Sequence, residues 1–116
     1  AAAIAGFIAW KLSRPAPVLS GGQPGAHRLE GVGIGYAAPM WDAGLVDEIV
    51  PVSTADAEAM ARRLAREEGL FAGTSSGANV IAAIRIAQRL GPGKSVATIL
   101  VDSGLKYLST PVFRRG

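Results

Sequence analysis

The chain has 116 residues, of which 49% are hydrophobic and 18% charged, and its net charge is +3 at pH 7. This composition indicates one globular domain, or part of one, and excludes a disordered chain. The sequence contains no cysteine and one histidine, which excludes disulfides, thiolate metal sites and metal-dependent hydrolysis. Arginines are scattered and only 6% of residues are aromatic, so nucleic-acid binding is not expected.

The first ten residues, AAAIAGFIAW, form an apolar run. The run is too short to cross a bilayer, which takes about 20 residues, and no positive charge precedes it as in a signal peptide. We therefore expect no membrane segment, a cytoplasmic location, and a buried helix over residues 1–14 that Pro15 stops. The uncapped start indicates that chain precedes it, so residues 1–116 are interpreted as one partial domain with a divergent N-terminal helix at 1–16.

Two glycine-rich stretches follow the N-terminal run. Residues 18–27 form a loop that holds His27, and a lone histidine without a partner nearby in the sequence is more often structural than catalytic. Residues 31–36 (GVGIGY) alternate glycine with larger residues, but they lack the spacing and the following helix of the dinucleotide-binding fingerprint. Two interpretations stay open for this stretch: a backbone that closely approaches a ligand, or a plain flexible loop.

Residues 46–52 (VDEIVPV) predict a short strand, which Pro51 places near a sheet edge. Ser53 or Thr54 then caps a helix, with Asp56 as a capping-box-like partner. Gly69 ends this helix, and its apolar positions recur at helical spacing, which predicts one buried face. Those positions are Ala57, Met60, Ala61 and Leu64.

A second helix follows the turn at residues 73–77 (GTSSG). Apolar residues cover nearly its whole circumference, which predicts burial on most sides, and Gly91 ends it. Residues 95–101 (SVATILV) then predict a strand of a parallel sheet covered on both faces, running straight into residues 102–104 (DSG). Ligands bind outside the carboxyl ends of such strands, and the free N–H groups of a helix start suit an anion. Both turns are therefore candidates for holding a small ligand.

The predicted elements indicate an α/β layered fold with a parallel sheet. Residues 73–77 also match the G-x-S-x-G nucleophile elbow of hydrolases, and Ser75 or Ser103 with His27 and Asp102 would supply a triad. The elbow needs a strand immediately before the turn and a histidine after the serine. Here residues 70–72 follow a helix end and His27 precedes Ser75, so a hydrolase is disfavoured.

Six sequence blocks, in this order over residues 17–113, closely resemble the C-terminal part of the cysteine synthase (O-acetylserine sulfhydrylase) family. These are fold-type II pyridoxal-phosphate enzymes, which include the cystathionine β-synthases. The blocks are PVLSGGQPGAH (17–27), EGVGIGY (30–36), LVDE (45–48), EEGL (67–70), GTSSGA (73–78), and DSG (102–104) with YLST (107–110). The resemblance implies a three-layer α/β domain with a parallel sheet, similar to the tryptophan synthase β-subunit, of which this chain is the C-terminal portion of the large, cofactor-binding domain.

The resemblance also implies roles for individual residues around pyridoxal 5′-phosphate. Ser75 would hydrogen-bond the pyridine nitrogen, and a neutral hydroxyl there would leave that nitrogen unprotonated, which suits β-elimination and β-replacement. Asp102 and Ser103 would lie beside the same edge of the ring. Gly31 and Gly33 would contact the cofactor on its substrate side, where Gly35 and Tyr36 belong to the substrate-side loop.

The implied reaction is β-replacement on O-acetylserine, in which sulfide replaces acetate to give cysteine. The implied partners are these small molecules, a second subunit in a homodimer, and serine acetyltransferase. The family's Schiff-base lysine and phosphate cradle lie N-terminal to the matched region, and Lys11, Lys94 and Lys106 match no lysine motif. We therefore expect no catalytic residue and no metal ligand in this chain, and no activity of the chain alone.

Other departures and alternatives stay open at this point. The strand that normally precedes Pro17 is not evident, and Val101 stands where the family usually has proline, with Leu105 and Lys106 where it has Glu-Arg. Within the enzyme class, a cystathionine β-synthase-like enzyme is the alternative. Outside it, a non-catalytic remnant that keeps the fold for binding or assembly is the competing interpretation.

Overall fold

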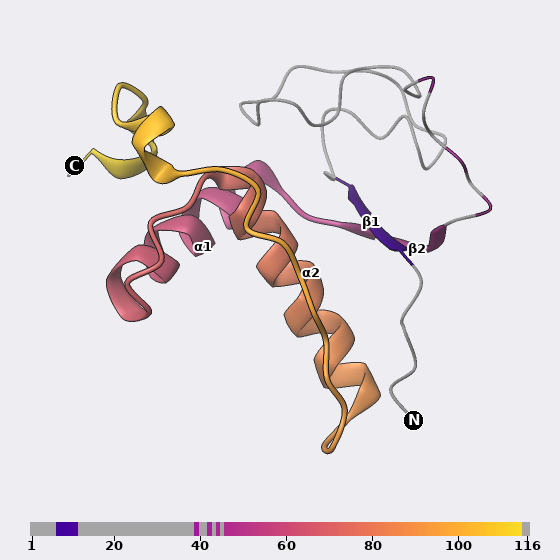
Figure 1. Ribbon diagram of the computed structural model, residues 1–116. Helices are drawn as coiled ribbons and strands as arrows, with labels where there is room; N and C mark the ends of the chain where they lie inside the picture. The colour runs from indigo at the N-terminus through magenta and orange to yellow at the C-terminus, as the bar shows by residue number, and fades with distance from the viewer. Residues whose placement is uncertain (1–6, 12–38, 40–41, 43, 45, 115–116) are drawn as a thin grey trace.

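The computed structural model describes residues 7–11, 39, 42, 44 and 46–114. In chain order its elements are strands β1 (Phe7–Lys11) and β2 (Val46–Pro51), helices α1 (Thr54–Glu67) and α2 (Thr74–Leu90), and the 3₁₀ turns η3 (Gly104–Tyr107) and η4 (Pro111–Phe113). The strand pair lies at one end of the two helices and the 3₁₀ turns lie at the other (Figure 1). The α/β class is thereby confirmed.

Strands β1 and β2 pair in parallel, with Ala9 opposite Ile49 and Trp10 opposite Val50. The parallel sheet and the strand at β2 are as predicted. The prediction of a helix over residues 1–14 is wrong at residues 7–11, which form strand β1. This strand occupies the place before Pro17 where the family normally has a strand and where the sequence did not make one evident. A short apolar run does not distinguish a buried helix from a buried strand by its periodicity, and the contact with β2 decides between them. The rest of 1–16 lies outside the described residues.

Helix α1 begins as the sequence predicts. Ser53 is its N-cap: the Ser53 Oγ accepts a hydrogen bond from the Asp56 N–H at 3.1 Å and donates one to Asp56 Oδ2 at 2.6 Å. Gly69, with φ +68°, follows the last turn in the left-handed conformation that glycine adopts at helix ends. The buried face consists of Ala57, Glu58, Ala61 and Leu64, and Met60 is half-buried.

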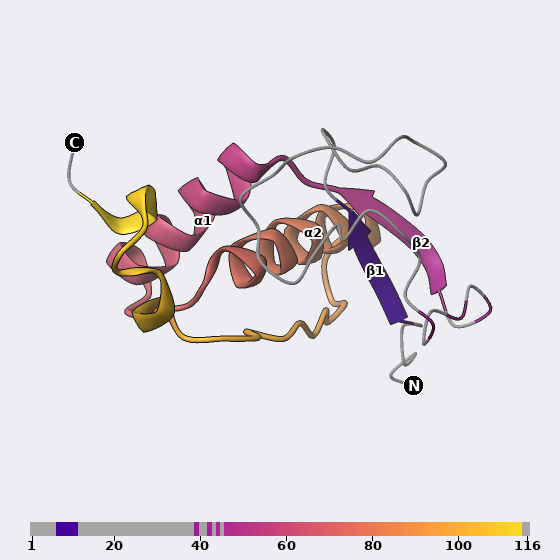
Figure 2. The ribbon, with the colours of Figure 1, turned by 90° about the horizontal axis from the view of Figure 1, so that it is seen from above.

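Helices α1 and α2 pack side by side (Figure 2) and touch through small residues. Val52, Ala57 and Ala78 are fully buried at this contact. Gly77 of α2 comes so close to α1 that a Cβ on it would lie 2.2 Å from the Ala57 carbonyl oxygen. A second cluster, Val50, Ala82 and Ile86, packs β2 against the middle of α2. These two contacts fix the start of α2 relative to the sheet.

Helix α2 differs from its prediction in two ways. Its N-cap is Gly73 and no side chain caps it, so Ser76, a candidate cap by its place at the helix start, is not one. Residues 74–79 are all buried, but beyond them only Ala82 and Ile86 are, and Ile84 and Leu90 are 42% and 47% exposed. Apolar residues extend around more of α2 than its neighbours bury, because α1, β2 and the segment after α2 cover only part of its circumference.

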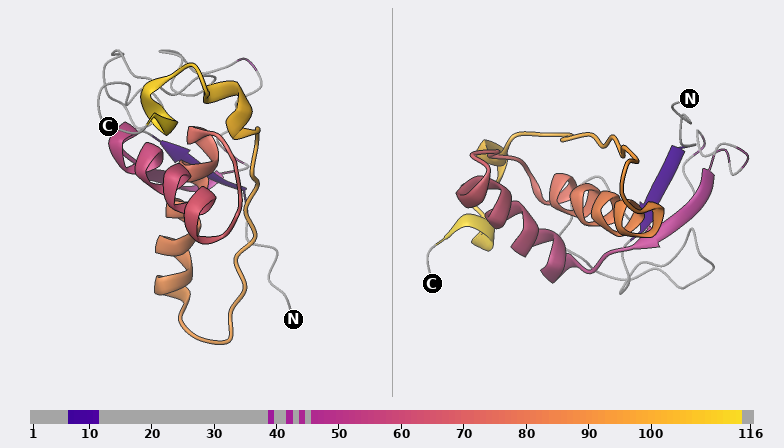
Figure 3. Two further views of the ribbon diagram at one scale, coloured as in Figure 1. Left: turned by 90° about the vertical axis from the view of Figure 1, so that its left-hand side faces the viewer. Right: turned by 90° about the horizontal axis from the view of Figure 1, so that it is seen from below.

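Residues 95–101 do not form the predicted strand. The segment runs back along α2 (Figure 3), and Ile99 and Val101 are 66% and 61% exposed. Two side chains of α2 hold its backbone: Asn79 Nδ2 donates to the Ile99 carbonyl at 2.8 Å, and Ser76 Oγ accepts from the Val101 N–H at 3.0 Å. A strand requires a neighbouring strand, and none of the described residues pairs with this segment.

The remaining side-chain contacts bind α2 to β2 and η4 to α1. Arg89 forms an ion pair with Glu48, and Arg85 donates to the Pro51 carbonyl, so α2 is bound to β2. At the other end the Arg62 guanidinium donates to the Val112 carbonyl at 3.1 Å, which fastens η4 to α1. No helix in the described part of the chain has the length and hydropathy to span a membrane.

Candidate functional site

The turn before α2 and the turn at residues 102–104 are joined by backbone hydrogen bonds. The Gly73 N–H donates to the Asp102 carbonyl and the Gly104 N–H donates to the Phe71 carbonyl, each at 3.0 Å. Ala72 and Ser103 form an isolated antiparallel bridge between them. The two stretches that the sequence singles out, 27 residues apart at Ser75 and Asp102, therefore form one site.

The carboxylate of Asp102 is the centre of this site. Its Oδ2 accepts a hydrogen bond from the Tyr107 hydroxyl at 2.8 Å, and its Oδ1 accepts one from Ser75 Oγ at 3.4 Å. Ser75 and Tyr107 are 5% and 2% exposed. Gly73 makes room for the carboxylate, because a Cβ there would lie 2.2 Å from Asp102 Oδ1. We call Ser75, Asp102 and Tyr107 the Asp102 cluster.

The first turn of α2 contributes two further hydroxyl groups, both fully buried. Ser76 Oγ is used by the Val101 N–H. Thr74 Oγ1 has no hydrogen-bond partner of regular geometry among the described residues, although the Thr74 hydroxyl lies near enough to Tyr107 to lower that tyrosine's pKa. A buried hydroxyl oxygen without a partner is uncommon in folded proteins and marks a place where a further polar group is accommodated.

The electrostatics of the α2 start differ from what the sequence alone indicates. The helix dipole is positive there and favours an anion. The carboxylate of Asp102 already lies beside this end, within hydrogen-bond reach of Ser75. The Lys106 ammonium also lies near this site, with its Nζ 5.8 Å from the centre of the Tyr107 ring. The positive helix end is thus balanced within the chain, and the site does not need a phosphate for this purpose.

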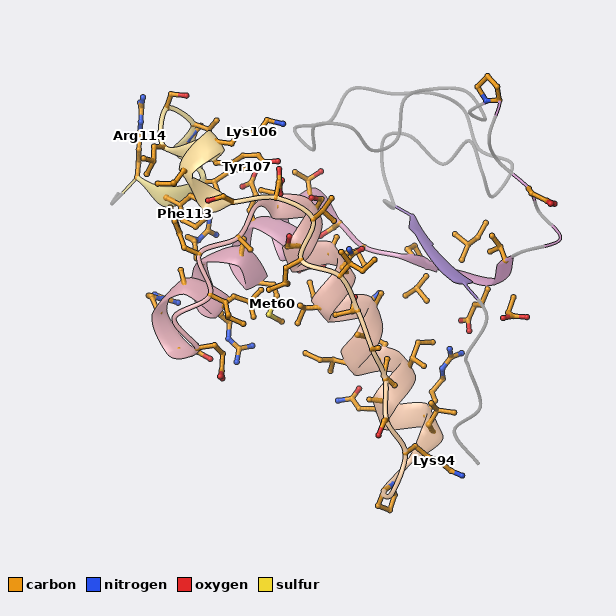
Figure 4. All side chains as sticks on the ribbon, in the orientation of Figure 1. Met60, Lys94, Lys106, Tyr107, Phe113 and Arg114 are labelled. Atoms are coloured by element: carbon orange, nitrogen blue, oxygen red, sulfur yellow. The ribbon has the colours of Figure 1, made fainter. Side chains whose placement is uncertain are left out.

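Tyr107 and Lys106 lie together on η3, above the start of α2, whereas Lys94 lies at the opposite end of that helix (Figure 4). Burial raises the pKa of Tyr107, because it disfavours the phenolate, and the hydrogen bond to Asp102 raises it further. The Thr74 hydroxyl and the Lys106 charge act in the opposite direction. The Tyr107 hydroxyl therefore stays protonated and keeps donating to Asp102.

This arrangement predicts a pH dependence of stability. The pKa of Tyr107 in the folded chain lies above its unfolded value of about 10. Its contribution is therefore fully present below about pH 10 and is lost as the pH rises through the folded pKa. A Tyr36→Phe variant leaves Tyr107 as the only tyrosine in the sequence, so its phenolate absorbance can be followed directly. We expect a midpoint above 10 in the folded chain; a midpoint at or below 10 would contradict the buried hydrogen bond.

The predicted site residues divide into three groups. Ser75 and Asp102 come together as expected. Ser103 lies beside them in sequence, but its hydroxyl accepts from the Leu105 N–H at 3.2 Å and caps η3. Gly31, Gly33, Gly35 and Tyr36, together with His27, lie outside the described residues. Within the described part of the chain, no group of three or more acidic or histidine side chains is placed to bind a metal.

The sequence assigns Tyr107 no role at the site, and it assigns Ser76 only that of a helix cap. Tyr107 belongs to the YLST block, and its place three residues after Gly104 in a 3₁₀ turn carries its hydroxyl back to Asp102. Ser76 follows Ser75 directly, and its partner is a backbone N–H rather than a ligand. The adjacency of two serines gives no sign of which one serves which purpose, since helix geometry alone turns them to different sides.

A family model described as "Pyridoxal-phosphate dependent enzyme" matches residues 10–102. The chain therefore belongs to the pyridoxal-phosphate-dependent enzyme family. Among curated proteins, it is 48% identical over 97 residues to the cysteine synthase of Staphylococcus aureus strain Mu50 and, equally, to the probable cysteine synthase of Bacillus subtilis strain 168. Each match covers 84% of this chain and 31% of the relative, so the chain spans about a third of their length.

Solved structures agree with the sequence relatives. A cysteine synthase from Entamoeba histolytica matches with a TM-score of 0.85 at 33% identity, covering 93% of this chain and 32% of that structure. An O-acetylserine-dependent cystathionine β-synthase from Helicobacter pylori matches with a TM-score of 0.81 at 35% identity, covering 92% and 34%. The resemblance to the fold-type II enzymes is thus confirmed, and pyridoxal phosphate is the cofactor of the family.

The described residues fit one edge of such a cofactor. Ser75 offers a buried neutral hydroxyl, and Thr74 Oγ1 is left without a regular partner in the same turn. The Asp102 carboxylate contacts Ser75, so an anionic group of the chain itself already lies at this helix start. This donor set suits the heterocyclic ring of the cofactor better than its phosphate group, which carries charge of the same sign as Asp102.

Proposed function

We propose that this chain supplies the ring-nitrogen side of the cofactor site in a cysteine synthase-like enzyme. The proposed reaction is β-replacement on O-acetylserine, with sulfide as the incoming group and cysteine and acetate as products. The observation that supports this assignment is the Asp102 cluster at the junction of the two turns. It places a buried hydroxyl, oriented by a carboxylate, at the start of a helix that the family match covers.

In this proposal each residue of the chain has a defined task. Ser75 binds the ring nitrogen, Asp102 orients Ser75, and Tyr107 holds the Asp102 carboxylate. The bound pyridoxal phosphate supplies the electron-withdrawing ring on which β-replacement depends. Gly31 and Gly33 are proposed to lie against the cofactor, and Gly35 and Tyr36 to form the substrate-side loop. Ser103 contributes by capping η3, which keeps Tyr107 in reach of Asp102.

Other proposals concern the setting of the enzyme. We propose a cytoplasmic homodimer with serine acetyltransferase as a protein partner. Both proposals rest on the resemblance to the cysteine synthases. Similarity to the O-acetylserine-dependent enzyme of Helicobacter pylori favours a cystathionine β-synthase-like reaction as the second candidate. The two reactions share the first substrate and differ in the incoming sulfur nucleophile, so a comparison of sulfide with homocysteine separates them in an enzyme that also contains the Schiff-base lysine region.

Binding of a pyridine ring tests the proposed role of Ser75. The probe is pyridoxine 5′-phosphate, which has no aldehyde and so does not react with lysines. We expect saturable changes in the backbone amide signals of residues 73–77 and 102–104 in NMR spectra of the chain. Ser75→Ala should weaken binding about 2- to 13-fold, which corresponds to the loss of one hydrogen bond of about 0.5–1.5 kcal/mol.

The matched control for this experiment is Ser95→Ala. Ser95 is an exposed serine outside both turns, so its replacement should leave the affinity unchanged. Circular dichroism checks that both variants keep the helices. Equal affinities of the wild type and Ser75→Ala would contradict the assignment of Ser75 to the ring. Absence of probe binding to the wild type would favour a non-catalytic remnant.

A further inference from the structure

The segment at residues 95–101 carries apolar side chains that the described residues leave uncovered. Ile99, Leu100 and Val101 are 66%, 40% and 61% exposed. At its start Val96 packs against the core cluster between β2 and α2, so the segment is attached to the fold. It contains no charged residue and no proline, which are the usual means by which an exposed strand edge is kept from pairing. The segment therefore has the composition of a buried strand while it lies at the surface.

The backbone of the 95–101 segment is held along one edge only. The segment runs extended along α2 (Figure 3), where two side chains of that helix bind the Ile99 carbonyl and the Val101 N–H. Successive residues of an extended chain turn their N–H and C=O groups to opposite edges. The backbone groups of Thr98 and Leu100 thus face away from these contacts, and no described strand pairs with them. An edge of this kind is suited to the addition of a strand.

We propose that the 95–101 segment is a docking edge that becomes a strand when it pairs with an apolar strand from the rest of the cysteine synthase fold. The curated relatives are matched over 31% of their length, and the Entamoeba histolytica structure over 32%. About two thirds of each relative therefore has no counterpart in residues 1–116. That part is the occupant to which the exposed edge points, and the pairing does not depend on the proposed ring site.

Docking at this edge would act on the candidate site through the backbone. The segment runs directly into Asp102, whose carbonyl accepts a hydrogen bond from the Gly73 N–H at 3.0 Å. One residue earlier, the Val101 N–H donates to Ser76 Oγ at 3.0 Å. A strand paired with the 95–101 segment therefore also restrains the turn at residues 102–104 against the start of α2.

Co-expression with the complementary part of a relative tests the docking edge. This chain, carrying an affinity tag, is produced together with the part of the Staphylococcus aureus cysteine synthase that lies N-terminal to its match. We expect a soluble 1:1 complex by chromatography with light scattering, and a monomer for this chain alone. In the complex, the amide hydrogens of Thr98 and Leu100 should exchange with solvent at least about 10-fold more slowly than in the free chain.

Ile99→Lys should prevent docking, because pairing would bury an unpaired charge, and we expect recovery of the partner to fall at least about 10-fold. Leu105→Lys is the matched control. Leu105 is 65% exposed, lies outside the 95–101 segment and stands where the family usually has glutamate, so recovery should be unchanged. Both side chains are exposed in the free chain, and circular dichroism checks that both variants keep the helices.

Three results would overturn the proposal. One is a wild-type chain that recovers no partner, or no more than Ile99→Lys does. Another is a complex in which Thr98 and Leu100 exchange as fast as in the free chain. The third is self-association of the chain alone that Ile99→Lys abolishes, which would assign the edge to a second copy. Binding of pyridoxine 5′-phosphate to the chain is measured separately, so none of these results decides the proposed function.

Discussion

Replacing Gly73 with alanine is expected to displace the Asp102 carboxylate and to destabilise the chain. The new Cβ would lie 2.2 Å from Asp102 Oδ1 and 2.5 Å from Tyr107 Cε2. The φ of Gly73 is −75°, which any residue adopts, so the cost comes from contact and not from the backbone. Overpacking of this kind costs about 1–3 kcal/mol. Urea unfolding measures the loss, and the pKa of Tyr107 should fall as its buried bond to Asp102 is broken.

A double substitution separates this contact from a general effect on α2. With Asp102 replaced by alanine, the Gly73→Ala variant should lose less stability than in the wild-type background, because one of the two contacts is gone. Additive losses of the two substitutions would show that Gly73 and Asp102 are not in direct contact. A Gly73→Ala chain with full stability and an unchanged Tyr107 pKa would contradict the packing of the site.

Replacing Gly77 with alanine is expected to separate the two helices. Its Cβ would lie 2.2 Å from the Ala57 carbonyl oxygen and 2.9 Å from the Ala61 nitrogen, both backbone atoms of α1. Backbone atoms cannot turn away as a side chain does, so α2 must shift. We expect a net loss of about 1–3 kcal/mol, even though alanine improves helix propensity by about 1 kcal/mol. Thermal unfolding should show a Tm lowered by about 4–8 °C per kcal/mol.

The control for Gly77 is a change of similar size on the outer face of the same helix. Ala87 is exposed, and Ala87→Ser should alter stability by less than about 0.5 kcal/mol. If Gly77→Ala were as stable as the wild type, the close packing of α1 on α2 would be wrong. That contact also fixes the start of α2, so Gly77→Ala should weaken ring binding together with stability.

The relation between the two turns explains how a short chain brings Ser75 and Asp102 together. The backbone bonds between Gly73 and Asp102 and between Phe71 and Gly104 hold the turns in register. The Asp102 carboxylate then does two things: it balances the α2 dipole and it orients Ser75. The start of α2, which by its dipole is suited to an external anion, therefore already has the Asp102 carboxylate of its own chain beside it.

The amino-acid sequence by itself determined the local features of the fold. Ser53 and Asp56 capped α1, Gly69 ended it, and the strand predicted at 46–52 formed β2 at Val46–Pro51. These signals depend on neighbours a few residues away, which the sequence displays directly. The six family blocks likewise pointed to the α/β fold, the cofactor and the place of Ser75 and Asp102, and the comparisons confirmed the family.

Only the tertiary structure decided the features that depend on distant partners. Phe7–Lys11 is a strand because it pairs with β2, and residues 95–101 are not one because no described strand lies beside them. The role of Tyr107, and the use of Ser76 by the Val101 N–H in place of a cap, also arise from contacts across the fold. An apolar run or a serine pair is compatible with several environments. Which one applies is set by the hydrogen bonds and burial that partners far along the chain provide.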